Sequence, residues 1–93
     1  KVKIKKVKAA KKGKKATVTW KKVSGAAGYQ VTYSLKKKFK NAKTITVSAS
    51  KAKTVLRKLK KNKKYYVKVR AFKTYRGQTN YGNYSKVKKV TIK

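Results

Sequence analysis

The chain has 93 residues, the size of one small domain, and carries 32 lysines and arginines but no aspartate, glutamate, histidine or cysteine, giving a net charge of +32. These absences exclude a carboxylate pair, a Ser-His dyad, a thiol nucleophile and a good set of metal ligands, so we expect no enzymatic activity, no cofactor and no metal site. No uncharged run is long enough for a membrane-spanning helix, and residues 1–10 lack the apolar core of a signal peptide.

Hydrophobic residues make up 39% of the chain and recur at strand spacing, which favours one folded domain over residues 1–93 rather than a disordered polycation. In the first half they alternate with polar residues, as in strands with one buried face. The predicted strands of this half are residues 3–10, 16–20 and 29–33. The first is weak, since only Ile4 and Val7 are large and apolar among its lysines. Turns are expected at residues 11–15 and 23–28, which contain glycines.

The second half adds four predicted strands, at residues 44–48, 54–57, 65–72 and 84–92. The predicted loops between them are residues 36–43, 48–53 and 73–83. We expect a bulge in the last strand, because Val87, Val90 and Ile92 do not share one parity. Seven short strands at intervals of roughly ten residues, without a 3.6-residue period, predict an all-β fold, the antiparallel immunoglobulin-like β-sandwich.

The clearest segment is residues 59–72, LKKNKKYYVKVRAF, in which a buried face alternates from Tyr65 onward. Leu59 precedes Tyr65 by six residues. We expect the Tyr65 ring in the core and its hydroxyl bonded to the backbone near Leu59, as in the tyrosine corner of immunoglobulin-like sandwiches. Trp20, Leu59 and Tyr65 are the predicted structural residues. The predicted core consists of Val18, Trp20, Tyr29, Val31, Tyr33, Ile45, Val47, Leu56, Leu59, Tyr65, Val67, Val69, Ala71, Val90 and Ile92.

Three motifs carry a family resemblance. The strand that ends at Trp20 is followed by Gly28-Tyr29-x-Val31-x-Tyr33, and then by Leu59 with Tyr65-x-Val67-x-Val69-x-Ala71. In this order and spacing they resemble a fibronectin type III domain over about residues 4–92, and in particular the lysine-rich bacterial modules of that family. The resemblance implies a seven-stranded sandwich.

Two departures from the family pattern are informative. Family members usually carry Pro-Gly in the turn after the leucine, where this chain has Lys61-Asn62. Asparagine tolerates the left-handed conformation, so we expect the turn to form. Integrin-binding members carry Arg-Gly-Asp before the last strand, whereas here Arg76-Gly77 is followed by Gln78. The carboxylate that would meet a metal is missing, so we expect no adhesion of that kind.

The lack of acidic residues suggests an origin. Acidic residues make up roughly an eighth of an average chain, so finding none among 93 has a chance probability on the order of 1 in 100,000. We hypothesise a supercharged, engineered variant on a fibronectin type III template, acting as a polycationic scaffold. The alternative is a natural binding or spacer module of a bacterial secreted or cell-surface protein, which would place the chain outside the cell.

Such a charge predicts sequence-independent electrostatic binding of polyanions, namely nucleic acid, heparin-like polymers, acidic proteins and free sulfate or phosphate, by a chain that is a monomer in isolation. The simpler alternative is that the lysines only provide solubility. The candidate polyanion-binding residues are Lys36, Lys37, Lys38, Lys40, Lys60, Lys61, Lys63, Lys64, Lys68, Arg70 and Arg76. The candidates for stacking on bases are Tyr75, Tyr81 and Tyr84, and Tyr66 and Phe72 are further aromatic residues next to basic ones. The alternative is structural, with Tyr66 and Phe72 on the outer face of the larger sheet and Tyr84 packing on the last strand.

Overall fold

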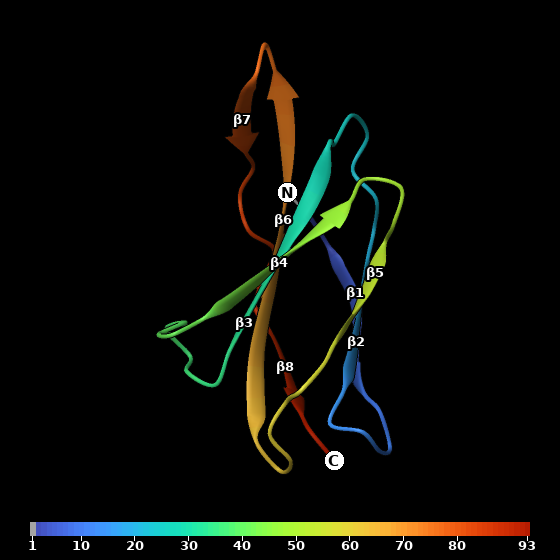
Figure 1. Cartoon of the computed structure of the whole chain (residues 1–93), viewed down its shortest axis with the longest axis vertical. Coiled ribbons are helices and arrows are strands. Elements are labelled where there is room, and N and C mark those ends of the chain that lie inside the picture. The colour runs from blue at the N-terminus through green and yellow to red at the C-terminus, as the bar shows by residue number, and fades with distance from the viewer. Residues whose placement is uncertain (1) are drawn as a thin grey trace.

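The computed structural model describes residues 2–93 and contains two antiparallel β-sheets packed face to face (Figure 1). The strands are β1 (Ile4–Ala9), β2 (Ala16–Trp20), β3 (Gly28–Ser34), β4 (Lys43–Ser48), β5 (Lys53–Leu56), β6 (Lys64–Tyr75), β7 (Gln78–Tyr81) and β8 (Lys88–Thr91). The smaller sheet has the order β1-β2-β5, and the larger has β4-β3-β6-β7, with β8 also paired to β6. The predicted all-β immunoglobulin-like sandwich is confirmed. Nowhere in residues 2–93 is there a helix long and apolar enough to cross a membrane.

The core lies between the sheets and follows the predicted alternation. Along β2 the inward residues Ala16, Val18 and Trp20 are buried, and the threonines between them are half-buried. The indole of Trp20 packs on the ring of Tyr29, with 5.4 Å between ring centroids. Thirteen of the predicted core residues are buried. Burial of this apolar surface supplies the main driving force for folding.

Two predicted core residues are only half-buried, and four core residues were missed. Ile45 lies on β4, an edge strand, and Ala71 lies where β6 leaves the sandwich, so neighbours cover each on fewer sides. The missed residues are Val2, Ile4, Ala9 and Ala16. Three of these four come from the lysine-rich first strand and the residues before it, where the charged background obscures the pattern.

The tyrosine corner is confirmed. Tyr65 is buried, and its hydroxyl accepts a hydrogen bond of 2.8 Å from the backbone N–H of Lys60, next to Leu59. Asn62 has a φ of 62°, so the turn that lacks Pro-Gly forms with asparagine in the left-handed conformation. The N–H of Asn62 donates to the carbonyl of Ile92, which ties this turn to the end of the chain.

The predicted loop 73–83 is wrong. Instead, β6 continues to Tyr75 and forms a hairpin with β7 through the two-residue turn Arg76-Gly77. Both turn residues have positive φ, 48° and 77°, as in a type I′ turn, whose twist matches that of the flanking strands. The prediction failed because all four residues of β7 are exposed, so no alternating face marks the strand.

The predicted last strand, 84–92, is also too long. Only β8 is a strand, and residues 82–87 cross over from the upper part of β6 to its lower part. At the crossing, the Ser85 N–H donates to the carbonyl of Val69, and the Val69 N–H donates to Ser85 Oγ at 3.0 Å. A side chain here replaces a backbone acceptor, so the pairing is interrupted before β8 begins. The predicted bulge is not found, because β8 pairs with β6 in continuous register and the exposed Val87 precedes the strand. The eighth strand, beyond the seven expected, is β7, which lies within the predicted loop 73–83.

Candidate functional site at the basic end

Consecutive loops of an antiparallel sandwich lie at alternating ends, so the first, third and fifth loops share one end (Figure 1). We call these loops, residues 10–15, 35–42 and 57–63, the basic end. They hold four, four and five lysines or arginines respectively, thirteen in all. The loops at the opposite end, residues 21–27, 49–52 and 76–77, hold two, one and one. The positive charge of the loops is therefore strongly polarised along the long axis.

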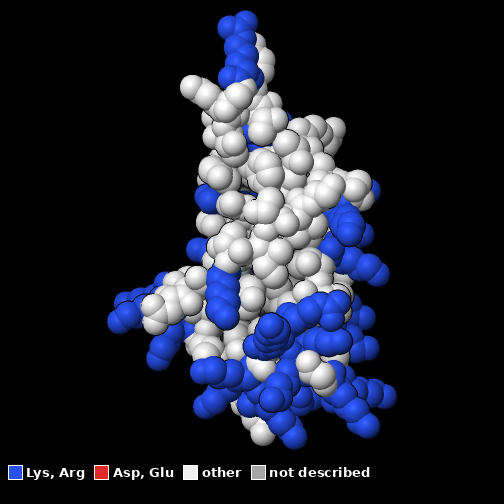
Figure 2. Space-filling view, in the orientation of Figure 1, with Lys and Arg blue, Asp and Glu red and all other residues white. Residues whose placement is uncertain are grey.

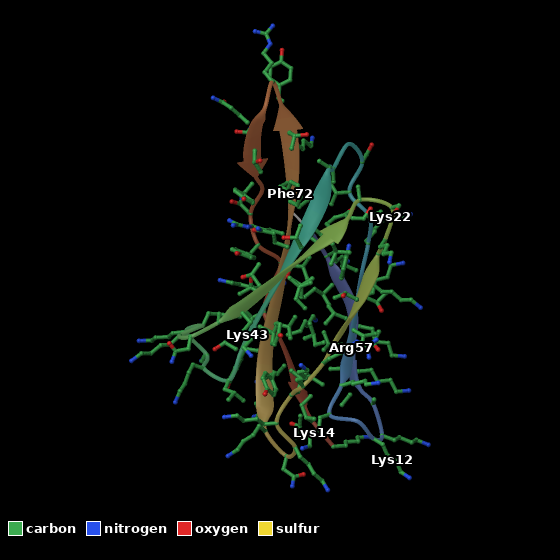
Figure 3. The ribbon with its side chains drawn as sticks, in the orientation of Figure 1. Lys12, Lys14, Lys22, Lys43, Arg57 and Phe72 are labelled. Atoms are coloured by element: carbon green, nitrogen blue, oxygen red, sulfur yellow. The ribbon has the colours of Figure 1, made fainter. Side chains whose placement is uncertain are left out.

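The same asymmetry is visible on the surface. In Figure 2 the basic side chains crowd the lower half of the face shown, and most of its upper half is uncharged. Lys12 and Lys14 project from the lower end, and Lys22 lies in the upper part (Figure 3). Because the sequence has no aspartate or glutamate, no side chain of the chain neutralises these ammonium groups. Such a surface attracts anions from solution.

Buried hydroxyl groups and backbone bonds fix the conformations of the three loops. Ser34 Oγ donates to the carbonyl of Lys40 at 2.8 Å and accepts from the N–H of Lys36 at 3.1 Å, which closes the loop 35–42. The tyrosine corner fixes the loop 57–63. The Leu59 N–H donates to the carbonyl of Lys14, joining that loop to residues 10–15. The lysines therefore project from a backbone that is fixed before any ligand arrives.

A pocket of about 270 Å³ opens between the loop 35–42 and residues 58–60. Its floor is apolar and comprises Leu35, Leu59 and the rings of Tyr33 and Tyr65, whose centroids are 6.3 Å apart. Five lysines line it, namely Lys36, Lys40, Lys43, Lys58 and Lys60, together with Ser34 and Asn41. Burial raises the pKa of the Tyr33 phenol above its ordinary value of 10.0, and the neighbouring Tyr65 adds to the rise. The phenol is therefore neutral at physiological pH, and the charges around the pocket are all positive.

Two basic residues of β6 have a different environment. On the outer face of the larger sheet, Lys68 Nζ lies 4.3 Å from the ring centroid of Phe39 and 4.1 Å from that of Tyr84. Arg70 Cζ lies 4.7 Å from the Tyr84 ring and 3.9 Å from the Tyr81 ring. The Tyr81 ring in turn lies 6.0 Å from that of Phe72. We call these six residues the cation–aromatic stack, in the order Phe39, Lys68, Tyr84, Arg70, Tyr81, Phe72.

The stack has two further supports. Arg70 Nε donates to Gln30 Oε1 at 2.9 Å, across to β3. Phe72 lies over Gly28, where an added Cβ would come within 2.5 Å of the ring and 2.9 Å of the Val47 carbonyl oxygen. Both cations are thus held against ring faces and are half-buried, whereas all lysines of the basic end except Lys15 are exposed.

The sequence model described as fibronectin type III domain matches residues 3–88. The chain belongs to the fibronectin type III family. Members of this family are generally non-catalytic modules with binding or spacing roles. No curated protein matches the sequence.

Solved structures agree on the fold. The FN1–FN3 domains of chicken contactin-1 (CNTN1) are similar, with a TM-score of 0.81 and 27% identity over 96% of this chain, which spans only 30% of that one. A fibronectin type III domain of human contactin 1 has a TM-score of 0.76 and 20% identity, covering 97% of this chain and 76% of that one. A structure described as a myokine has a TM-score of 0.71 and 19% identity, covering 99% and 93%. At these identities the last two show the fold alone.

The fibronectin type III fold separates the predicted site residues into three groups. Seven lie in the basic end: Lys36, Lys37, Lys38, Lys40, Lys60, Lys61 and Lys63. Lys64 follows them at the start of β6. Lys68 and Arg70 lie in the cation–aromatic stack with two predicted stacking residues, Tyr81 and Tyr84. Arg76 and Tyr75 lie at the opposite end, in and beside the hairpin turn, with Arg76 Cζ 5.3 Å from the Tyr75 ring.

The basic end also contains cations that the sequence interpretation passed over. Lys58 lines the pocket, and the loop 10–15 supplies Lys11, Lys12, Lys14 and Lys15. Lys43, at the start of β4 beside the basic end, also lines the pocket. The signal was present in the sequence, because alternation of loops between ends assigns residues 11–15 to the same end as residues 36–43. Basic runs considered one by one do not reveal this grouping. Among residues 2–93, no group of three or more metal-ligating side chains occurs.

Proposed function

We propose that this fibronectin type III domain is a non-enzymatic binding module that holds polyanionic polymers on its basic end by charge. The polarised distribution of the loop cations carries this proposal, with thirteen at one end and four at the other. A uniform lysine coat that served only solubility would have no reason to gather at one end. Whether the chain is engineered or a natural cell-surface module stays a hypothesis, and the proposed binding does not depend on it.

Binding of this kind follows from counterion release. An anionic polymer that contacts about six of these lysines should lose roughly a thousandfold in affinity between 50 mM and 200 mM salt. Lysine presents a flexible point charge, whereas bidentate reading of a base edge favours arginine. The basic end holds one arginine, Arg57, and its cations come from loops rather than from an element shaped for a groove. We therefore expect no sequence preference.

The test compares two variants of equal charge. The first replaces by glutamine six exposed lysines of the basic end, Lys36, Lys37, Lys40, Lys58, Lys60 and Lys61. The control replaces six exposed lysines outside it, Lys3, Lys5, Lys21, Lys22, Lys51 and Lys86. Each variant is titrated with fluorescent single-stranded DNA, heparin and a neutral polysaccharide over a salt series.

We expect the basic-end variant to bind DNA and heparin at least about tenfold more weakly than the control, with a shallower salt dependence. The neutral polysaccharide should not bind either variant. Equal losses in the two variants would refute a localised site, since binding would then depend on net charge alone. Failure of the unchanged chain to bind any polyanion at 50 mM salt would refute the proposal altogether.

A further inference from the structure

We infer that the pocket between the loop 35–42 and residues 58–60 binds a single sugar residue that carries a sulfate or phosphate ester. The inference deepens the proposed function, because the pocket lies within the basic end and its occupant would be one unit of an anionic glycan. Such a pocket would select sugar esters among anions, whereas binding by charge alone does not distinguish one anion from another. Its support is the combination of an apolar floor with a cationic rim.

The rim supplies the recognition of the ester. Lys36, Lys40 and Lys43 line one side, and Lys58 and Lys60 line the other, so an anionic group entering the pocket meets ammonium groups from two loops. Lysine is a strong ligand for phosphate and sulfate oxygens, to which it donates charge-assisted hydrogen bonds. Asn41 adds an amide that can bond to a hydroxyl group. A sugar ester presents both kinds of group.

The floor selects against a bare ion. Leu35 is 36% exposed and lies in the pocket with Leu59, Tyr33 and Tyr65. Inorganic sulfate gains nothing from such a surface, whereas the C–H face of a sugar ring buries apolar area on it. The rings of Tyr33 and Tyr65 are tilted by 53°, so they offer no slot between parallel faces for a flat aromatic acid. A ring with one apolar face and polar edges fits this arrangement.

Size and rigidity agree with a single sugar. Pockets for drug-sized ligands span roughly 300–1,000 Å³, and this one is slightly smaller, at about 270 Å³. The Ser34 hydroxyl braces one wall and the Tyr65 hydroxyl braces the other. The ring of Phe39, in the same loop as Lys36 and Lys40, is in contact with the ammonium group of Lys68, 4.3 Å from the ring centroid. A pocket formed before binding loses less conformational freedom when the ligand arrives.

Three leucines provide the readout, because Leu35 and Leu59 line the pocket and Leu56 is fully buried outside it. The chain with labelled leucine methyl groups is titrated with glucose 6-sulfate, glucose 6-phosphate, glucose, inorganic sulfate and inorganic phosphate, each at the same ionic strength. We expect both sugar esters to shift the Leu35 and Leu59 methyl signals saturably, at least about fivefold more tightly than the inorganic ions. The Leu56 signals should stay in place, and glucose alone should have little effect.

Two variants test the contributions of the floor and of the rim to binding separately. Leu35→Ser removes an exposed part of the floor and should abolish the preference for sugar esters over inorganic ions. Lys36→Gln/Lys60→Gln should weaken both sugar esters about tenfold, whereas the charge-matched control Lys21→Gln/Lys22→Gln should weaken them less than twofold.

The outcomes distinguish this inference from the proposed function. Equal affinity for sugar esters and inorganic ions, or shifts spread evenly over the lysine surface, would overturn the inference while DNA binding leaves the proposed function standing. If the unchanged chain bound neither DNA nor the sugar esters, both the inference and the proposed function would be overturned. A preference for only one ester would identify the source of the anionic group as sulfated or phosphorylated glycan.

Discussion

The basic end and the cation–aromatic stack place positive charge in opposite settings. At the basic end, ammonium groups project into solvent from loops and have no anionic partner in the chain. On the outer face of the larger sheet, Lys68 and Arg70 each lie between two aromatic rings. A cation over a ring face is stabilised by the ring's quadrupole without any carboxylate. In a chain without acidic residues, aromatic rings thus take the place that ion pairs usually hold.

The stacked cations Lys68 and Arg70 therefore stabilise the fold, whereas mutual repulsion among the exposed lysines of the basic end destabilises it. The stack connects the loop 35–42, strand β6, the crossing segment 82–87 and the end of β7. The exposed lysines repel one another and are available to a ligand. Substitutions in the two regions should therefore have effects of opposite sign on stability.

The largest effect is expected at Gly28, beneath the end of the stack. Gly28→Ala would place a Cβ 2.5 Å from the Phe72 ring and 2.9 Å from the carbonyl oxygen of Val47. The ring can move, but the carbonyl belongs to the paired strand β4, so we expect a loss of about 2–3 kcal/mol from overpacking. Urea unfolding measures it. A variant as stable as the unchanged chain would show that the stack does not depend on this close approach.

A smaller effect of the same sign is expected at Arg70. Arg70→Gln removes contacts with two rings and the bond to Gln30, so we expect a loss of about 1–2 kcal/mol. Arg70→Lys retains the charge but loses the planar guanidinium group. Its stability should therefore lie between that of Arg70→Gln and that of the unchanged chain. The control is Lys37→Gln at the basic end, which should leave stability unchanged or raise it slightly in low salt. If Arg70→Gln and Lys37→Gln had equal effects, the distinction between stacked and free cations would fail.

The sequence predicted the sandwich because its core strands alternate without interruption. In β2 and β6 every inward residue is apolar, and the spacing of Leu59 and Tyr65 located the tyrosine corner. The hairpin of β6 and β7 escaped prediction since β7 has no buried face, and only the Arg-Gly turn marks it. Period-two reasoning detects burial, and strands outside the core lack that signal.

The candidate site was predicted only in part. Seven of its lysines stand in two obvious runs, but the pocket depends on Leu35 and Tyr33, whose exposure on its floor is set by the path of two loops. The cation–aromatic stack could not be predicted from the sequence either, because it too depends on how separate segments pack. Phe39, Lys68 and Tyr84 come from three separate segments, and their distances are decided by packing rather than by spacing along the chain.

Added salt should raise the thermal stability of the chain, because it screens the repulsion among the cations of the basic end. The screening length falls from about 30 Å at 10 mM to about 8 Å at 150 mM salt, so repulsion among the thirteen loop cations weakens. We expect the Tm to rise by about 5 °C between 10 mM and 500 mM chloride, which corresponds to about 1 kcal/mol, and to rise further with sulfate. The six-lysine variant of the basic end should respond less than its charge-matched control. A Tm that is flat over this range would contradict the expectation.

The smallest effect concerns Tyr33 in the floor of the pocket. Its pKa is raised in the folded chain by burial, with a further contribution from Tyr65, so the fold favours the neutral phenol. The resulting stability is fully present below pH 10.0, the ordinary value, and is lost as the pH rises through the raised pKa. The pH dependence of the unchanged chain alone does not isolate the contribution of this phenol. The variant Tyr33→Phe keeps every lysine and lacks only the phenol hydroxyl. The difference in unfolding free energy between the two chains therefore isolates the contribution of the tyrosine.

That difference should be constant from pH 7 to pH 9. Towards pH 11 the unfolding free energy of the chain with Tyr33 should fall relative to that of Tyr33→Phe. A constant difference over the whole range would show that the Tyr33 hydroxyl is as well hydrated in the folded chain as in the unfolded one, and would leave the pocket floor more polar than its residues indicate.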